Sequence, residues 1–284
     1  MARKIDINQL GKERVLMTEC IGIDAGGTLI KVVYKERDEY LYQTFLSNEV
    51  EKLVKWINEW HPNAKLKITG GKQENISKLL HNPHELIDEF EATTIGIKEV
   101  LKRAELYLPE KYLLVNVGTG TSIHSMIGEN SERLGGSGIG GGTLMGLSYL
   151  LTRQKQFEEI MLLAEKGKRT GIDLKVRDIY EGDRSPISGD LTASNFGFLE
   201  RMTGEELQED ILACLVGMIS EAVLMMVMPF AKAIESSTIV FIGSTFHNNA
   251  LFKKQLQRFE DLFELKLHFP FNGQYSGAHG ALLY

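Results

Sequence analysis

The segment that most constrains this chain is an apolar run that ends in Asp24 and passes through Gly26 and Gly27 into Thr28. A second β-prone run follows at residues 29–34, so the pattern predicts a β-hairpin with the aspartate, the glycines and the threonine at its tip. Glycines have no Cβ and let backbone N–H groups approach a phosphate, and an aspartate at a strand end can hold a hydrated Mg²⁺ that phosphates share. An ordinary surface hairpin has the same local pattern, so the function depends on the rest of the chain.

A second strand, Gly/Thr turn and resumed strand occupy residues 113–124. Aligning the two turns pairs Gly27 with Gly120. Two such hairpins in one chain suggest a duplicated domain, with two phosphate-binding turns that face each other across a cleft. A third strand-to-glycine turn follows at residues 239–246. In this order the three turns resemble the phosphate-1, phosphate-2 and adenosine motifs of the actin-like ATPase and sugar-kinase superfamily.

The composition is that of a globular protein that acts on a small molecule. The 284 residues carry a net charge of −6, and 43% of them are hydrophobic and 25% charged. An acidic chain lacks the clustered Lys and Arg that hold nucleic acid, so no nucleic-acid partner is expected. The two cysteines, Cys20 and Cys214, are far apart and have no metal-ligand spacing, which indicates reduced thiols in a cytoplasmic protein.

Two segments could be mistaken for targeting or membrane elements. Residues 1–19 are rich in charged side chains and lack the apolar core of a signal peptide, so we expect an N-terminal extension. Residues 211–230 are nearly all apolar over a length that could cross a bilayer, but Gly217, Ser220 and Glu221 lie in the middle. Because a charge at bilayer depth costs about 2.5–3.5 kcal/mol on insertion scales, the segment is predicted to be a buried core helix and not a membrane span.

The stretch between the two hairpins alternates helix and strand. The spacing of apolar residues predicts a helix at residues 50–60, and residues 66–69 have the pattern of a short strand. Local rules then conflict: residues 82–85 look like a capped helix start, whereas residues 85–90 alternate well enough for a strand. The family resemblance described below implies a strand that leads into a helix, so we expect a strand at 85–90 and a helix at 92–103.

The second half of the chain follows the same alternation, which indicates an α/β protein. A domain junction is expected at residues 109–111. Further helices and one strand are predicted beyond it: helices at 144–151, 155–167 and 249–263 and from Ser276, and a strand at 265–269.

A glycine-rich run precedes the predicted helix at residues 144–151. Gly136, Gly138 and Gly141 fit the G-x-G-x-x-G pattern of a dinucleotide fold, but that pattern should follow directly on a strand, and residues 128–132 look like a polar turn. The run is therefore predicted to be a flexible loop that leads into a helix N-terminus, where free N–H groups and the helix dipole favour an anion.

Six segments in order give the chain a specific family resemblance. Together they resemble the type II pantothenate kinases: Ile-Asp-Ala-Gly-Gly-Thr-Leu-Ile-Lys at 23–31, Glu-Phe-Glu-Ala at 89–92, Asn-Val-Gly-Thr-Gly-Thr-Ser at 116–122, Arg-Leu-Gly-Gly-Ser-Gly-Ile-Gly-Gly-Gly-Thr at 133–143, Gly-Asp-Leu-Thr-Ala-Ser-Asn-Phe-Gly at 189–197 and Ile-Gly-Ser-Thr-Phe-His-Asn-Asn at 242–249.

The resemblance implies the fold and the activity. It implies ATP-dependent, Mg²⁺-requiring phosphorylation of pantothenate to 4′-phosphopantothenate, the first step of coenzyme A synthesis, by a cytoplasmic homodimer. It also implies an α/β fold of duplicated actin-like (ribonuclease H-like) ATPase domains, with a nucleotide cleft between them. After the extension, the two domains are expected at residues 20–112 and 113–284.

Phosphoryl transfer needs positioned phosphates, a divalent cation and a base near the accepting hydroxyl. Asp24 is the candidate ligand of the cation. Arg133 is a candidate substrate contact because a guanidinium can pair with the carboxylate of pantothenate, and Thr192 is a second one. Phe157 is placed near adenine by the resemblance alone, since the residue type is more often found in a core. The expected nucleotide contacts are Asp24, Ala25, Gly26, Gly27, Thr28, Leu29, Ile30, Lys31, Thr119, Gly141, Gly142, Thr143, Leu144, Met145, Phe157 and Ser244.

The acceptor on pantothenate is a primary alcohol, so a carboxylate is expected to take its proton as the bond to phosphorus forms. If residues 85–90 form a strand, Asp88 and Glu89 point to opposite faces, and Glu91 lies where it would cap the next helix. Glu89 is therefore the predicted base, and it also matches the Glu of the family's Glu-Phe-acidic-Ala motif.

Two other functions share these motifs. A kinase of the same superfamily that acts on a sugar such as N-acetylglucosamine is the alternative, because the phosphate hairpin does not select the acceptor. The second alternative is a regulator that binds a nucleotide without catalysing a reaction, and the presence of both Asp24 and Glu89 argues against this alternative.

Overall fold

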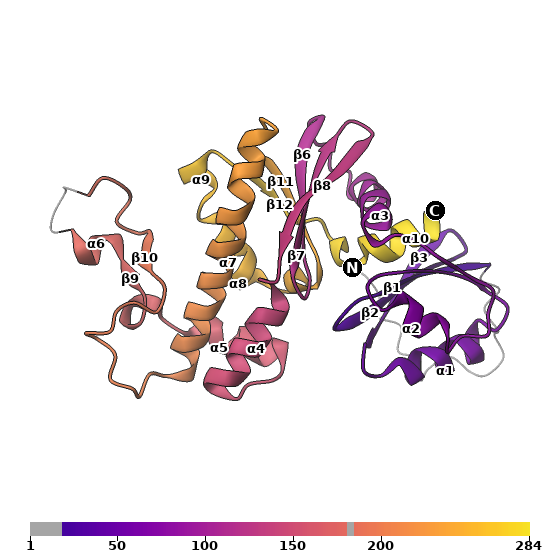
Figure 1. Cartoon of the computed structure of the whole chain (residues 1–284), viewed down its shortest axis with the longest axis horizontal. Helices are drawn as coiled ribbons and strands as arrows, with labels where there is room; N and C mark the ends of the chain where they lie inside the picture. The colour runs from indigo at the N-terminus through magenta and orange to yellow at the C-terminus, as the bar shows by residue number, and fades with distance from the viewer. Residues whose placement is uncertain (1–18, 181–184) are drawn as a thin grey trace. The chain divides into compact units, whose positions relative to one another are not determined.

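The computed structural model describes residues 19–180 and 185–284, and Figure 1 shows their helices and strands. The chain divides into two compact units: unit 1 takes residues up to Leu108 together with Pro270–Tyr284, and unit 2 is Pro109–Phe269. The division at Pro109 falls inside the expected junction. The expected second domain, 113–284, differs from the structure in its last part, because the C-terminal segment returns to unit 1. The expected N-terminal extension, except for Glu19, lies outside the described residues.

Unit 1 is built on a five-stranded sheet in the order β3-β2-β1-β4-β5, in which β1, β2 and β3 are antiparallel and β4 and β5 run parallel to β1. Helices α1 and α2 share one apolar cluster with the sheet. Helix α10 forms a second cluster with β2 and β3, and Ala92 of α3 packs with Ile87 and with Ala281 of α10. The elements are β1 (Cys20–Ala25), β2 (Leu29–Glu36), β3 (Glu39–Leu46), α1 (Val50–Trp60), β4 (Lys65–Thr69), α2 (Gln73–Ser77), β5 (His84–Leu86), α3 (Glu89–Arg103), a 3₁₀ turn (Gly273–Tyr275) and α10 (Ser276–Leu283).

Unit 2 is built on a second five-stranded sheet, in the order β12-β11-β6-β7-β8, and it also carries a two-stranded sheet of β9 and β10. One large apolar cluster joins the five-stranded sheet to helices α4, α5, α7 and α8. The elements are β6 (Lys111–Val117), β7 (Thr121–Ile127), β8 (Asn130–Ser137), α4 (Gly141–Thr152), α5 (Phe157–Lys166), a 3₁₀ turn (Arg169–Gly171), β9 (Leu174–Lys175), α6 (Val176–Ile179), β10 (Thr192–Ser194), α7 (Gln208–Ala233), β11 (Thr238–Ile242), a 3₁₀ turn (Ser244–Phe246), α8 (Ala250–Gln257), α9 (Glu260–Phe263) and β12 (Lys266–His268).

The two sheets have the same topology, which confirms the predicted duplication. In each sheet the first three strands in sequence are antiparallel neighbours, and the last two add in parallel on the other side of the first. The turns of the two hairpins differ in length, however. The closing pairs are Ala25 with Ile30 and Val117 with Thr121, so the first turn is one residue longer. Matching these pairs places Asn116 at the position of Asp24, and the predicted alignment of Gly27 with Gly120 is therefore wrong.

Helix α7 is the predicted buried helix. It is long and apolar enough to cross a membrane by length and composition, but 61% of its most apolar window is buried within the described structure. Its buried residues, among them Leu215, Ile219 and Val223, belong to the core of unit 2. The apolar run is therefore explained by packing inside a folded unit. Both cysteines are free, as expected.

Two local predictions are wrong. The expected strand at 85–90 ends at Leu86, and α3 begins at Glu89, because the Asp88 carboxylate accepts hydrogen bonds from the N–H groups of Phe90 (2.9 Å) and Glu91 (3.0 Å) and so caps the helix. The expected polar turn at 128–132 is mostly strand β8, whose exposed residues lie on the edge of the sheet. Gly135 and Gly136, which were expected in a flexible loop, lie in this strand, so the glycine run begins within an antiparallel edge strand and not after the first strand of a βαβ unit.

Helix α10 packs on unit 1 at glycines, where backbone meets backbone. A Cβ on Gly96 of α3 would lie 1.8 Å from the carbonyl oxygen of Ser276, and a Cβ on Gly280 would lie 1.6 Å from that of Ala92. A Cβ on Gly22 of β1 would lie 2.1 Å from the carbonyl oxygen of Ala278. Only glycine permits these approaches, so the sequence positions of three glycines fix where the C-terminal helix sits.

Replacing Gly96 with Ala is expected to lower the free energy of unfolding of unit 1 by about 3 kcal/mol or more, because overpacking costs about 1–3 kcal/mol in cores where side chains can adjust, and here the methyl group meets backbone. Urea unfolding followed by tryptophan fluorescence measures this directly, since both tryptophans lie in α1. Gly71→Ala is the matched control: its Cβ would find only the Glu89 side chain, at 3.9 Å. Equal losses for the two variants would contradict the assignment.

Candidate functional site

The predicted hairpin tip of unit 1 carries a partly buried ion pair. Asp24 and Lys31 lie opposite each other in the ladder between β1 and β2, and Lys31 Nζ donates to Asp24 Oδ2 at 2.8 Å. Each side chain is only 13% exposed. The lysine therefore holds the carboxylate in a fixed position and balances part of its charge.

Two glycines from distant parts of the chain close around Asp24. A Cβ on Gly70, at the end of β4, would lie 2.7 Å from Asp24 Oδ1, and Gly70 has a left-handed backbone, with φ of 94°. A Cβ on Gly277, in the first turn of α10, would lie 3.1 Å from Asp24 Oδ2. The carboxylate thus sits at a helix N-terminus, where the helix dipole stabilises negative charge.

The tip itself is held by hydrogen bonds to its carbonyl groups. The Gly26 N–H donates to the Leu29 carbonyl at 3.1 Å and closes the turn. Ser47 Oγ donates to the Gly26 carbonyl at 2.8 Å, and Lys72 Nζ donates to the Gly27 carbonyl at 2.9 Å. These bonds fix the loop while Gly27 and Thr28 stay exposed.

Glu89 belongs to the same electrostatic site as Asp24. It is the first residue of α3, and a Cβ on Gly71 would lie 3.9 Å from its Oε2. Partial removal from water raises the pKa of the Glu89 carboxyl, the Asp24 carboxylate raises it further, and Lys31 lowers it. The side chain is still accessible to solvent. The capping role that the sequence analysis gave to Glu91 belongs to Asp88 in the structure. The Glu89 carboxylate is not the cap of the helix and remains accessible for a proton transfer.

In unit 2 the second glycine turn is joined to the start of α4. The N–H of Gly141 donates to the Gly118 carbonyl, and the N–H of Gly142 donates to the Thr119 carbonyl, both at 2.8 Å. A Cβ on either Gly141 or Gly142 would lie within 2.8 Å of the same turn. The expectation of free N–H groups at this helix start is wrong for these two residues, since the second glycine turn already uses them.

The duplication places an amide where unit 1 has its carboxylate. Gly243 follows β11 as Gly70 follows β4, and its φ of 109° is also left-handed. A Cβ on Gly243 would lie 2.8 Å from Asn116 Oδ1, just as one on Gly70 would meet Asp24. The two units have the same backbone arrangement at this position, but only unit 1 has a negatively charged side chain there. A cation is therefore expected in unit 1 and not in unit 2.

The remaining predicted nucleotide residues lie near the second turn or in the core of unit 2. Thr143 Oγ1 donates to the Gly138 carbonyl at 2.8 Å, and Leu144 is fully buried. Met145 and Phe157 pack partly buried against the core, in agreement with the reading of Phe157 as a core residue. Ser244 opens the 3₁₀ turn after Gly243.

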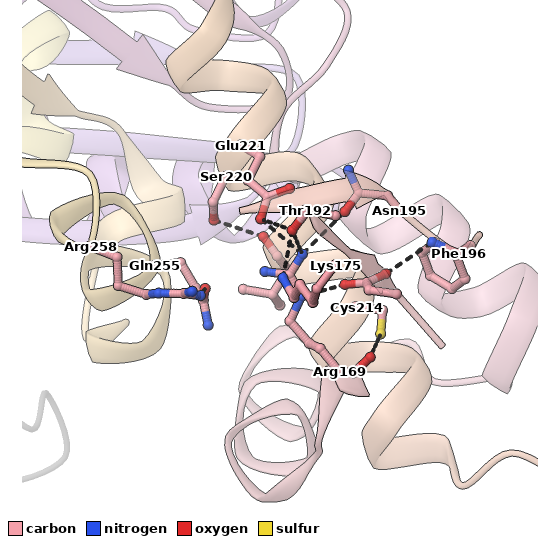
Figure 2. Close-up of polar contacts among 12 residues, drawn as sticks. Arg169, Lys175, Thr192, Asn195, Phe196, Cys214, Ser220, Glu221, Gln255 and Arg258 are labelled. Atoms are coloured by element: carbon pink, nitrogen blue, oxygen red, sulfur yellow. Dashed lines mark hydrogen bonds and ion pairs between the residues drawn. The ribbon is translucent and has the colours of Figure 1, made fainter. Parts of the chain in front are cut away.

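The two predicted substrate residues have different surroundings. Arg133 is exposed on the edge strand β8, and its guanidinium lies beside Gly136, whose Cβ would meet it at 2.9 Å. Thr192 is part of a buried polar network, shown in Figure 2. Its hydroxyl accepts from Lys175 Nζ at 2.6 Å and from Arg169 Nη2 at 3.2 Å, and it donates to Glu221 Oε1 at 2.9 Å. All of its hydrogen-bonding capacity is therefore used inside the protein.

Arg169 is the centre of that network. It bonds to Asp173 through Nε at 2.5 Å, and through Nη2 to Asn195 at 3.1 Å and Glu221 at 2.9 Å (Figure 2). Burial alone would lower the pKa of the guanidinium, but Glu221 and Asp173 raise it above its usual value. A Cβ on Gly217 would lie 2.2 Å from Arg169 Cζ, so the glycine inside α7 makes room for the guanidinium to cross the helix.

Sequence reasoning missed several residues of these sites. Gly277 and Arg169 carry no local signal, because each acts on a residue far away in the sequence. Gly70 follows the predicted strand at 66–69, and a glycine directly after a buried strand is the signal that Gly70 shares with Gly243. Asn116 lies at the position in β6 that matches Asp24 in β1, and comparing the ends of the two strands would have found it.

Comparison with known proteins gives consistent matches. A family model described as Fumble matches residues 79–284. The chain is 40% identical to a type II pantothenate kinase of Bacillus cereus over 94% of this chain and 98% of that protein. It is 39% identical to a type II pantothenate kinase of Staphylococcus aureus, over 92% and 98% of the respective chains.

Solved structures share the fold at low sequence identity. Component A of the (R)-2-hydroxyglutaryl-CoA dehydratase of Acidaminococcus fermentans has a TM-score of 0.60 at 13% identity, covering 93% of this chain and 96% of that one. The ROK hexokinase of Thermus thermophilus has a TM-score of 0.51 at 14% identity, covering 94% and 98%. Together with the two matching sheets, these similarities confirm the actin-like ATPase fold predicted from the sequence.

Arg169→Gln is expected to lower the free energy of unfolding by about 3–5 kcal/mol, because it leaves the Asp173 and Glu221 carboxylates without their buried partner. Urea unfolding followed by circular dichroism measures the change. Arg201→Gln is the control, since Arg201 is exposed and its guanidinium lies over the Phe198 ring at 4.1 Å, an interaction worth about 0.5–1 kcal/mol. A loss for Arg169→Gln no larger than that of the control would show that the network contributes little.

Proposed function

The chain belongs to the type II pantothenate kinase family, and we propose that it transfers the γ-phosphoryl group of ATP to the primary alcohol of pantothenate. The product is 4′-phosphopantothenate, and the reaction is the first step of coenzyme A synthesis. The observation that carries this proposal is the grouping of Asp24, Lys31 and Glu89 in one site of unit 1, where the pKa of the Glu89 carboxyl is raised partly by Asp24.

These three residues supply what phosphoryl transfer requires of a protein. Asp24 would hold Mg²⁺, directly or through water, and the ion when bound neutralises charge on the phosphates. The donor set fits, because Mg²⁺ binds through one or two carboxylates plus phosphate oxygens. Lys31 orients Asp24 and brings positive charge to the phosphate region.

The remaining contacts are assigned to the glycine turns of the two units. Residues 25–30 of the first hairpin and Thr119 of the second are assigned to the phosphates. The start of α4, Phe157 and Ser244 are assigned to the rest of the nucleotide. Since the N–H groups of Gly141 and Gly142 are occupied by the second turn, their role is to hold that turn and to present a surface without side chains.

Arg133 and Thr192 are proposed to serve the pantothenate. Arg133 is exposed and can pair with the substrate carboxylate in a forked geometry. The hydroxyl of Thr192 is saturated by Arg169, Lys175 and Glu221, so Thr192 would contact the substrate through its methyl group or backbone.

The direct test is a coupled assay of ADP release with pantothenate and N-acetylglucosamine offered in parallel. Pantothenate should give turnover that depends on ATP, and N-acetylglucosamine should give none above background. Turnover with the sugar alone would refute the proposal. ADP release that is the same with and without either acceptor would also refute it.

Asp24→Asn is expected to lower kcat by about 10²-fold or more, because the amide keeps the shape but not the charge that attracts Mg²⁺, and such charge stabilisation is worth several kcal/mol. Initial rates measured across a Mg²⁺ titration test this. Circular dichroism should show an unchanged fold. Near-normal turnover at saturating Mg²⁺ would remove Asp24 from the site.

Glu89→Gln is expected to lower kcat by about 10²–10⁴-fold, the usual contribution of a positioned base, with ATP binding nearly unchanged. Asp88→Asn is the matched control, since it changes the neighbouring carboxylate that caps α3. Because the pKa of Glu89 is raised, this carboxylate takes up its proton at a higher pH than an ordinary glutamate does. As the pH is lowered, kcat/KM should therefore begin to fall at a pH above the usual pKa of a glutamate. A greater loss of kcat in Asp88→Asn than in Glu89→Gln would overturn the assignment.

We also propose that the enzyme is a cytoplasmic homodimer. Helices α4 and α5 expose Leu150 (63%), Leu151 (53%) and Leu162 (62%), more apolar surface than isolated exposed residues usually present. Most of α7 is buried within unit 2, so the exposed leucines of α4 and α5 are the better candidates for the interface.

Sedimentation velocity at micromolar concentration should show a dimer that Leu162→Lys converts to a monomer, because a charge in a buried interface has no partner. Leu79→Lys is the control: Leu79 is 47% exposed and lies in unit 1. A wild-type monomer would refute the dimer, and an unaltered dimer in Leu162→Lys would remove Leu162 from its interface.

A further inference from the structure

Unit 1 contains a cavity that the kinase site does not use. Its volume is about 260 Å³, and all of its lining residues belong to unit 1. They come from β3, the end of α3, the segment that leads into α10 and α10 itself, and they are Tyr42, Val100, Arg103, Ala104, Phe271, Asn272 and His279. This space is called the Arg103 cavity below.

The charge of the cavity wall is positive and unbalanced. Arg103 is the one charged residue of the lining, and no acidic residue joins it. Among the residues that the structure describes, Arg103 forms no ion pair; its guanidinium lies 4.7 Å from the centre of the Tyr40 ring. Lys35 Nζ lies 4.6 Å from the same ring centre and also has no carboxylate partner in this part of the chain. Two cations thus flank one aromatic ring without a counter-ion.

A second polar group in the wall of the cavity, on His279, lacks a hydrogen-bond partner in the described structure. His279 is fully buried, its Nε2 lies 3.1 Å from the Tyr42 hydroxyl, and its Nδ1 has no hydrogen-bond partner in the described structure. Burial, with a smaller effect of Arg103 and Lys35, lowers the pKa of His279 to about 4, so the ring is neutral near pH 7. An unpaired buried nitrogen costs free energy, and this one lies in the wall beside the unpaired guanidinium.

The rest of the lining is apolar or amphipathic. Val100 and the Tyr42 ring provide apolar surface, and the Phe271 side chain is 63% exposed. Apolar walls with a few convergent polar groups are typical of small-molecule sites. A ligand that matches this wall has an apolar body and one anionic group.

We propose that the Arg103 cavity binds a small organic carboxylate, with the carboxylate on Arg103 and the apolar body against Val100, Tyr42 and Phe271. The guanidinium offers the forked donor geometry that carboxylates accept. Two lining residues are close in sequence to the points where the chain passes from one unit to the other. Ala104 comes shortly before the division after Leu108, and Phe271 comes directly after Pro270, where unit 1 resumes.

The experiment titrates the full-length chain with benzoate and follows heat release by calorimetry and the methyl signals of Val100 and Ala104 by NMR. Benzamide, which has the same shape without the charge, is titrated in parallel. Benzoate should bind once per chain and shift both methyl signals. The affinity for benzamide should be lower by about tenfold or by a larger factor, because a charge-assisted hydrogen bond is stronger than one between neutral groups. No benzoate binding in the millimolar range would overturn the proposal, as would equal affinity for benzamide.

Four variants locate the site. Arg103→Gln should weaken benzoate binding about tenfold or more. Phe271→Ala, a change at an exposed side chain, should also weaken it and provides a second measurement if the first variant folds poorly. Arg201→Gln, which removes another guanidinium that lies over an aromatic ring, and Arg133→Gln, which removes the proposed pantothenate contact, should leave it unchanged. Binding lost in Arg133→Gln but kept in Arg103→Gln would overturn the proposal and place benzoate in the kinase site.

Inorganic phosphate distinguishes a carboxylate site from a general anion site. It should displace benzoate only weakly, because it has no apolar body to contact Phe271 and Val100. Displacement by phosphate with an affinity equal to that of benzoate would overturn the proposed ligand class. The kinase assay is independent of these titrations, so failure of the cavity proposal leaves the proposed function to its own test.

Discussion

The close approach of α10 to α3 and β1 is the constraint on which the site in unit 1 depends. Backbone meets backbone at Gly22, Gly96 and Gly280, so helix α10 can sit in only one place on the unit. That placement brings Gly277 against Asp24, and the carboxylate lies at the N-terminus of the helix with Lys31 as its partner. Larger residues at these glycines would move the helix and with it the surroundings of the candidate metal ligand.

The duplicated frame explains why the two glycine turns are not equivalent. In each unit the penultimate residue of the first strand is polar and lies against a left-handed glycine that directly follows the neighbouring parallel strand. That side chain is the Asp24 carboxylate in unit 1 and the Asn116 amide in unit 2. Because an amide and a carboxylate have the same shape but differ in charge, only the position in unit 1 has the negative charge that a bound cation would need.

The network around Arg169 shows how unit 2 holds a loop that has little regular structure. Strands β9 and β10 are short, and buried charges and hydrogen bonds connect them to α7. Gly217 costs the helix about 1 kcal/mol relative to alanine, and it makes room for the guanidinium to pass over α7 to Glu221. The position of Thr192 is therefore set by a residue in a different part of the chain.

The sequence by itself determined the elements whose signals are local. The hairpin at Asp24, the helix at Val50–Trp60 and the buried helix α7 follow from turn residues and apolar spacing, and the ordered motifs were sufficient to identify the family. At residues 82–90 the strand chosen from the family resemblance and the alternative helix start at 82–85 were both misplaced, because β5 occupies His84–Leu86 and the hydrogen bonds of Asp88 start α3 at Glu89.

Only the tertiary structure decided which distant residues share a site. The return of α10 to unit 1, the use of the Gly141 and Gly142 N–H groups by the second turn, and the contact between Arg169 and Gly217 join segments far apart in the chain. No periodicity or spacing encodes such contacts, because they depend on how closely two backbones or a side chain and a backbone can approach. The sequence was enough to predict Asp24 and Glu89 as candidate site residues, whereas the packing of distant segments determined which groups surround them.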